Sequence, residues 1–120
     1  MSDLILCQRI TRPLENGHLK GPNNRLLTAA EVTSLCSMYW PFAEFGRAQL
    51  IAQCESGWWT GAWNYVGEDS RGLFQLNVEA HPDLKEWDLF DPQVNVYWAY
   101  DLWSREGWHP WSCAHTLGIV

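Results

Sequence analysis

Residues 44–57 read EFGRAQLIAQCESG, and this stretch decides the fold. Its apolar side chains and one carboxylate recur at spacings of three and four, which places them on one face of a helix: Phe45, Ala48, Ile51, Ala52 and Glu55. Gly57 suits the left-handed position that ends a helix. The stretch therefore predicts a helix from about Glu44 to Ser56 whose apolar face finishes in a carboxylic acid.

Two further helices are marked by their ends. Thr28-Ala29-Ala30-Glu31 is a capping box, so a helix begins there and runs towards Tyr39, and Pro41 lies at or beyond its end. Asp91-Pro92 places an N-cap before a proline, so another helix opens there and continues to about Glu106. This last helix is apolar on nearly all sides, which predicts a central and well-covered position.

The remaining segments are irregular or extended. Residues 58–77 are rich in Gly, Asp, Asn and Ser, which favours loops and short strands, and residues 1–26 carry enough turn formers to predict an irregular arm. Neither a repeat nor a low-complexity tract divides the chain. We expect one domain over residues 1–120, mainly helical with a small strand segment, in which residues 27–120 form the core.

Composition limits the classes of partner. The net charge is -6 and only eight residues are Lys or Arg, which argues against nucleic-acid binding. Neither a basic leader nor an apolar run of about 18 residues is present, so we expect no membrane insertion and no secretion directed by this sequence. Nine Trp residues offer flat apolar faces that suit sugar rings, although most of them are expected to pack in the core or at its rim.

Four cysteines permit three full pairings, and the sequence cannot choose among them: Cys7, Cys36, Cys54 and Cys113. Because no export signal is visible, we expect reduced and mostly buried thiols.

Glu55 is the leading candidate for chemistry. A carboxyl at the C-terminal end of a helix, on the face that points into the core, meets desolvation and the negative end of the helix dipole, and both raise its pKa. A carboxylic acid that stays protonated near neutral pH can protonate a glycosidic oxygen. The alternative is a solvated residue of the last helical turn.

Five motifs occur in the order of one known family. The segments 55–64 (ESGWWTGAWN) and 69–77 (DSRGLFQLN) resemble the soluble lytic transglycosylase domain and its goose-type lysozyme relatives. The later segments 81–84 (HPDL), 91–95 (DPQVN) and 107–112 (GWHPWS) look like the phage and actinobacterial branch of that group. The resemblance covers roughly residues 44–113.

The resemblance implies a lysozyme-like α+β fold with the strand segment lining a substrate groove. It implies that Glu55 is the general acid and then the base in cutting the β-1,4 bond between N-acetylmuramic acid and N-acetylglucosamine. Asn64 resembles the residue that positions the reacting sugar, Gln75 the one that reaches the glycan, and Gly72 would let backbone approach substrate. Ser70 and Asn77 are further candidates, with turn or strand-end roles as the alternative. Aromatic candidates for sugar stacking are Trp58, Trp59, Trp63, Tyr65 and Trp108.

Two features leave the reaction open. Residues 112–118 (SCAHTLG) replace the Ala-Tyr-Asn-x-Gly segment of many transglycosylases, so the tyrosine that contacts the catalytic carboxyl is unassigned. The candidates for its place are Tyr97, Tyr100 and Trp111. Hydrolysis needs a second carboxylate, for which Glu68 and Asp69 are candidates, whereas transglycosylation can reuse Glu55 alone. The alternative for both residues is an exposed loop charge.

Other functions fit less well. A cysteine peptidase using Cys54 is disfavoured because a thiolate is destabilised near a helix C-terminus. A zinc site from His109, Cys113 and His115 matches no common spacing, so no metal and no cofactor are expected. The non-enzyme alternative is a glycan-binding or virion structural protein without turnover. We expect a monomer whose partner is the peptidoglycan strand, acting on the bacterial cell wall as a phage lysin, a virion-associated lysin or an excised domain.

Overall fold

Helices and a small antiparallel sheet make up the part of the chain that the structure, a computed structural model, describes, residues 24–120. The helices are α2 (Ala29–Cys36), α3 (Phe45–Ser56), α4 (Pro92–Glu106) and α5 (Ser112–Thr116), with 3-10 turns η1 (Phe42–Glu44) and η2 (Pro82–Glu86). The strands are β1 (Trp63–Asn64), β2 (Ser70–Arg71) and β3 (Leu76–Asn77), in the order β1-β2-β3.

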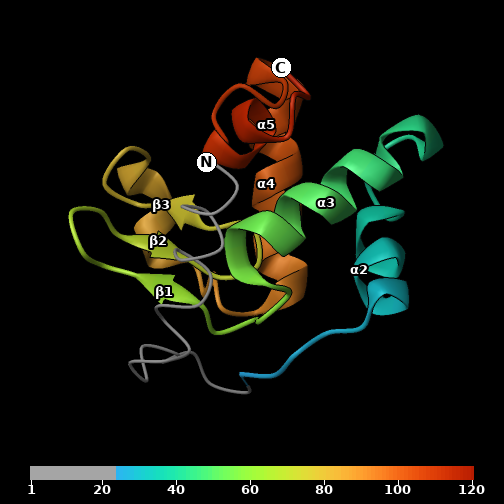
Figure 1. Ribbon diagram of the computed structural model, residues 1–120. Coiled ribbons are helices and arrows are strands. Elements are labelled where there is room, and N and C mark those ends of the chain that lie inside the picture. The colour runs from blue at the N-terminus through green and yellow to red at the C-terminus, as the bar shows by residue number, and fades with distance from the viewer. Residues whose placement is uncertain (1–23) are drawn as a thin grey trace.

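The sheet lies at one side of the molecule and α2 at the other, with α3 and α4 between them (Figure 1). This arrangement confirms the expected mainly helical α+β class. Residues 1–23 of the predicted N-terminal arm lie outside the described residues. No helix within residues 24–120 is both long enough and apolar enough to cross a membrane.

Local signals set the helix ends as the sequence predicts. The Thr28 hydroxyl accepts a hydrogen bond from the Glu31 N–H (3.1 Å), and the Glu31 carboxylate accepts one from the Thr28 N–H (3.0 Å), which completes the capping box. Gly57 ends α3 with φ 64°, and the Asp91 side chain caps α4. The first helix is shorter than expected, because α2 stops at Cys36 and turns carry the chain onward.

A single cluster of buried apolar residues joins the helices to the sheet. α4 contributes Val96, Ala99 and Leu102 to this cluster, but Tyr97 on the same helix is 43% exposed. The expectation that α4 is covered on nearly all sides is therefore wrong, since one of its aromatic faces lies at the surface. Aromatic residues on a helix do not by themselves show that it is buried.

Asn95 ties the sheet region to α4. Its side chain is fully buried; the oxygen accepts from the Phe74 N–H (2.8 Å), and the nitrogen donates to the carbonyls of Arg71 (3.0 Å) and Leu89 (2.9 Å). Because a buried amide that loses its partners costs free energy, these three bonds fix the segment around Phe74 against the helix.

Gly72 completes the same junction. Its φ is +76°, and a Cβ at this position would stand 2.1 Å from the Leu89 carbonyl oxygen and 2.4 Å from the Asn95 side-chain nitrogen. Glycine is therefore required here by backbone conformation and by close packing.

Two cysteines are joined, which corrects the expectation of reduced thiols. Cys54 in α3 and Cys113 in α5 form a disulfide, with Cα atoms 6.0 Å apart. Cys36 is a free thiol in the core, and burial raises its pKa to about 12. The disulfide links the end of α3 to α5 across 59 residues of sequence.

We expect Gly72→Ala to lower the free energy of unfolding by about 3 kcal/mol or more, because it adds both backbone strain and steric overlap. Gly46→Ala is the matched control. Gly46 lies on α3 with open space around it, so this substitution should change the free energy of unfolding by less than about 1 kcal/mol. Urea unfolding measures both variants. Equal stability of the two would contradict the packing role of Gly72.

Replacing both Cys54 and Cys113 with Ala should lower the free energy of unfolding by about 4 kcal/mol, the loop-closure contribution for a crosslink of this sequence separation. The measurement is urea unfolding with and without a reductant. The reductant should destabilise the wild type and leave the double variant unchanged. A wild type that is indifferent to the reductant would show that this bond contributes nothing.

Candidate active site

A cavity of about 250 Å³ opens beside the end of α3. Its walls come from α3, the sheet, the turn before η2, α4 and the start of α5. The lining residues are Glu55, Glu68, Ser70, Gln75, Leu76, Asn77, Ala80, His81, Leu102, Pro110, Trp111 and Ser112. The cavity thus brings together six of the residues singled out from the sequence: Glu55, Glu68, Ser70, Gln75, Asn77 and Trp111.

Glu55 is buried in the wall of this cavity, with 3% of its surface exposed. One carboxylate oxygen, Oε2, accepts a hydrogen bond from the backbone N–H of Cys113 (3.3 Å). Burial disfavours a charged carboxylate, whereas the N–H contact stabilises one. The surroundings therefore suit a group that gives up a proton and later takes one back.

Glu68 presents a second carboxylate to the same cavity from the turn between β1 and β2. Its Oε2 accepts from the Asn64 side-chain nitrogen (3.1 Å), and its Oε1 accepts from the Ser70 hydroxyl. Asn64 and Ser70 are both buried. These two predicted substrate contacts thus hold Glu68 in place, and Asn64 does not itself line the cavity.

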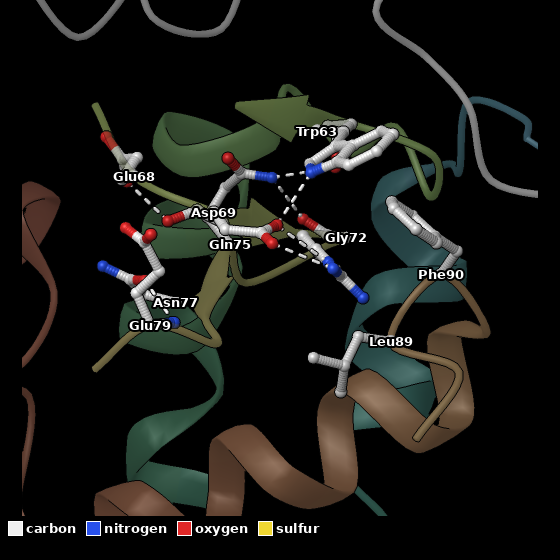
Figure 2. Close-up of polar contacts among 12 residues, drawn as sticks. Trp63, Glu68, Asp69, Gly72, Gln75, Asn77, Glu79, Leu89 and Phe90 are labelled. Atoms are coloured by element: carbon white, nitrogen blue, oxygen red, sulfur yellow. Dashed lines mark hydrogen bonds and ion pairs between the residues drawn. The ribbon is translucent and has the colours of Figure 1, made fainter. Parts of the chain in front are cut away.

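Asp69, the other candidate second carboxylate, is engaged elsewhere. Its oxygens accept from Nε and Nη2 of Arg71 (2.9 Å each), and Oδ1 also accepts from the Trp63 indole (2.8 Å). The hydrogen bond from Arg71 holds the pKa of Asp69 below its ordinary value, and the indole contact adds to this. In Figure 2, Glu68 lies towards Asn77 and Glu79, and Trp63 lies at the other end of the view. Asp69 is not among the cavity residues.

Gln75 reaches the cavity from a strained backbone position. Its φ is 50°, uncommon for a residue with a side chain, and its amide nitrogen donates to the carbonyls of Ala62 and Gly72 (3.0 Å each). Asn77 also lines the cavity, and its side-chain oxygen accepts from the Glu79 N–H (3.0 Å), which closes a turn. Both side chains are therefore fixed by local hydrogen bonds.

Asn64 is not alone: Gly72 and the five aromatic candidates for sugar stacking, Trp58, Trp59, Trp63, Tyr65 and Trp108, do not line the cavity either. The close approach that the missing side chain of Gly72 allows in the structure is to Leu89 and Asn95. Trp58 packs against the core and donates to the Gln49 carbonyl, and Tyr65 is 43% exposed beside Trp63.

Trp108 is wrong as a sugar-stacking residue. Only 5% of its surface is exposed, and its ring stacks on Trp40 with centroids 5.4 Å apart. The indole N–H donates to the Glu44 carboxylate (2.9 Å). These contacts leave no ring face for a sugar, because the aromatic core uses both the ring and its polar atom.

One of the three candidates for the place of the missing tyrosine lies in the cavity, and two further lining residues were not assigned a role in glycan cleavage from the sequence. Trp111 lines it beside Glu55, whereas Tyr97 and Tyr100, the two alternatives for the missing tyrosine, pack with Tyr39 instead. His81 and Ser112 also line it. Both residues lie in motifs of the family resemblance, 81–84 (HPDL) and 107–112 (GWHPWS), and these motifs could have identified them from the sequence. The hydrogen bond from the Cys113 N–H to Glu55 could not be predicted from the sequence, because every residue except proline has a backbone N–H donor.

The comparisons with known proteins agree with this geometry. The family described as "Lysozyme like domain" matches residues 44–113, more than half of the chain, and this range contains every residue lining the cavity. Comparison with the curated proteins gives no match, and comparison with the solved structures gives none either. The chain therefore belongs to the lysozyme-like domain family, a family of peptidoglycan-related glycosidases and transglycosylases.

Proposed function

We propose that this protein cleaves the β-1,4 bond between N-acetylmuramic acid and N-acetylglucosamine in peptidoglycan, with Glu55 as the general acid. One observation carries the proposal: a buried carboxyl and a second, fixed carboxylate line one open cavity, together with Gln75. Family membership supports the substrate class. The proposed place of action is the bacterial cell wall.

Glu55 donates its proton to the oxygen that joins the two sugars, and the bond to the departing sugar breaks as positive charge develops on the other ring. Burial favours the protonated starting state of Glu55. The Cys113 N–H then stabilises the carboxylate that remains.

We propose that the cleavage is a hydrolysis: as the glycosidic bond breaks, Glu68 takes a proton from a water molecule whose oxygen bonds to the anomeric carbon, so Glu55 acts only as the acid. Asn64 and Ser70 hold the Glu68 carboxylate at the cavity, whereas Asp69 is bound to Arg71 and Trp63. Hydrolysis with inversion requires two carboxyls about 6.5 to 9.5 Å apart, with a water between them. The competing outcome, attack by the muramyl 6-hydroxyl, needs only Glu55.

The first test replaces the acid. Glu55→Gln should lower the rate of cell-wall clearing by about 10²- to 10⁴-fold, because it keeps the shape of the side chain and removes its proton transfer. Binding to purified peptidoglycan, measured by co-sedimentation, should be retained. Glu86→Gln, an exposed position on η2, is the matched control and should clear normally.

Unchanged clearing by Glu55→Gln would refute the assigned acid. A wild type that binds peptidoglycan but releases no fragments would instead favour the non-enzyme alternative, a glycan-binding or virion structural protein.

The second test compares the neighbouring carboxylates. Glu68→Gln should lower turnover by about 10²-fold or more, since it removes the proposed base. Asp69→Asn should keep turnover and cost about 1 kcal/mol of stability. Because the pKa of Asp69 is lowered in the folded protein, this stability difference is present above the ordinary aspartate pKa and disappears as the pH falls through the lowered one.

The measurement is mass spectrometry of the released fragments together with urea unfolding at several pH values. Reducing ends from the wild type support hydrolysis. Anhydromuramyl ends, combined with an active Glu68→Gln variant, would show that Glu68 is not the base and that Glu55 acts alone.

A further inference from the structure

A second hollow lies on the surface of α4, away from Glu55. It has a volume of about 220 Å³ and is lined by Tyr39, Trp87, Gln93, Val94, Tyr97 and Trp98. We call these residues the aromatic hollow. Four of the six carry aromatic rings, and Trp87 and Tyr97 are 45% and 43% exposed. None of these residues belongs to the cavity at Glu55.

The rings of the aromatic hollow support one another. Trp98 packs against Trp87 (5.4 Å between ring centroids) and against Tyr97 (5.0 Å), and Tyr97 meets Tyr39 edge to face (5.6 Å). Aromatic side chains held in this way lose little conformational freedom when a ligand binds. Gln93, which is exposed, adds a side-chain amide at the edge of the rings.

A smaller depression lies between the aromatic hollow and the cavity at Glu55 and shares lining residues with both. Its lining includes His81 and Leu102, which also line that cavity, and Trp98, which also lines the aromatic hollow. From Gln93 to Leu102 the axis of α4 advances about 14 Å. The three depressions are therefore neighbours along α4, over a distance longer than a single sugar ring.

We propose that the aromatic hollow is a second glycan-binding site, which holds N-acetylhexosamine rings of the same β-1,4-linked strand that enters the cavity. This inference rests on the proposed function. The apolar faces of the sugar rings would stack on the exposed faces of Trp87 and Tyr97, and Gln93 would hydrogen-bond to a hydroxyl or acetamido group. Since the chain carries a net charge of -6, stacking supplies an attraction to a polyanionic wall that bulk charge does not.

The test uses the full chain carrying Glu55→Gln, so that binding is measured without turnover. Trp87→Ala with Tyr97→Ala should weaken binding to a soluble β-1,4-linked N-acetylglucosamine hexamer, measured by calorimetry, about tenfold or more, because two ring contacts are lost. Phe42→Ala is the matched control: Phe42 is 84% exposed and lies outside the hollow. It should bind the hexamer normally.

A second variant separates binding from folding. Trp87→Phe with Tyr97→Phe keeps both rings and should retain most of the affinity, and thermal melting checks that all variants are folded. Unchanged binding in the Ala variant would overturn the proposal. So would equal loss in Phe42→Ala, or a concentration-dependent dimer that the Ala variant abolishes, which would make the occupant a second copy of the chain.

The binding test of the aromatic hollow and the test of the proposed function can fail independently. If Glu55→Gln still clears cell walls, the assigned acid is wrong, and the hexamer measurement still decides whether the aromatic hollow binds sugar.

Discussion

The placement of the Glu55 carboxyl, buried at the end of α3, is the constraint on which the site depends. A charged carboxylate in such a position is costly, so the side chain needs a partner for the moments when it is ionised. α5 brings the Cys113 N–H to it, and the disulfide from Cys54 fixes α5 to the residue that precedes Glu55 in the chain. One covalent bond thus helps to hold the Glu55 carboxyl and its hydrogen-bond donor together.

The opposite wall of the cavity depends on a different anchor. Asn95 of α4 holds the backbone at Arg71 and Phe74, and Gly72 allows this segment to approach Leu89. Gln75 follows directly in the chain. This part of the cavity wall is consequently positioned by α4, the helix that also contributes residues to the aromatic hollow. The outer aromatic face of α4 contributes to the aromatic hollow, and the buried Asn95 side chain of α4 holds the segment that leads to Gln75. Both proposed glycan-binding sites thus depend on the same helix.

Local signals in the sequence were sufficient for α3, for the start of α2, for α4 and for the burial of Glu55, but not for the end of α2 or for α5. Capping at Thr28 and Asp91 and the glycine at position 57 act within one helical turn, so the sequence shows them directly. The spacing of three and four residues placed Glu55 on the buried face. The motifs of the resemblance added Asn64, Ser70, Gln75 and Asn77, all of which lie in the cavity wall or directly behind it.

Features that depend on contacts between residues far apart in the sequence could not be predicted from these local signals. Four cysteines give no preference among pairings, and the sequence does not show which of two adjacent carboxylates turns towards Glu55. Trp108 was assigned to substrate because tryptophan suits both sugars and cores, and only the packing against Trp40 decides between them. The sequence likewise does not show that Gly72 allows a close approach to Leu89 and Asn95, because a glycine does not identify its neighbours.

A crystal structure of the Glu55→Gln variant with a bound peptidoglycan tetrasaccharide would test the central claim most directly. Our account predicts that the oxygen joining N-acetylmuramic acid to N-acetylglucosamine lies within hydrogen-bonding distance of the side chain at position 55, inside the cavity that Gln75 and Glu68 line. A glycan bound with every such oxygen out of reach of that side chain would contradict it.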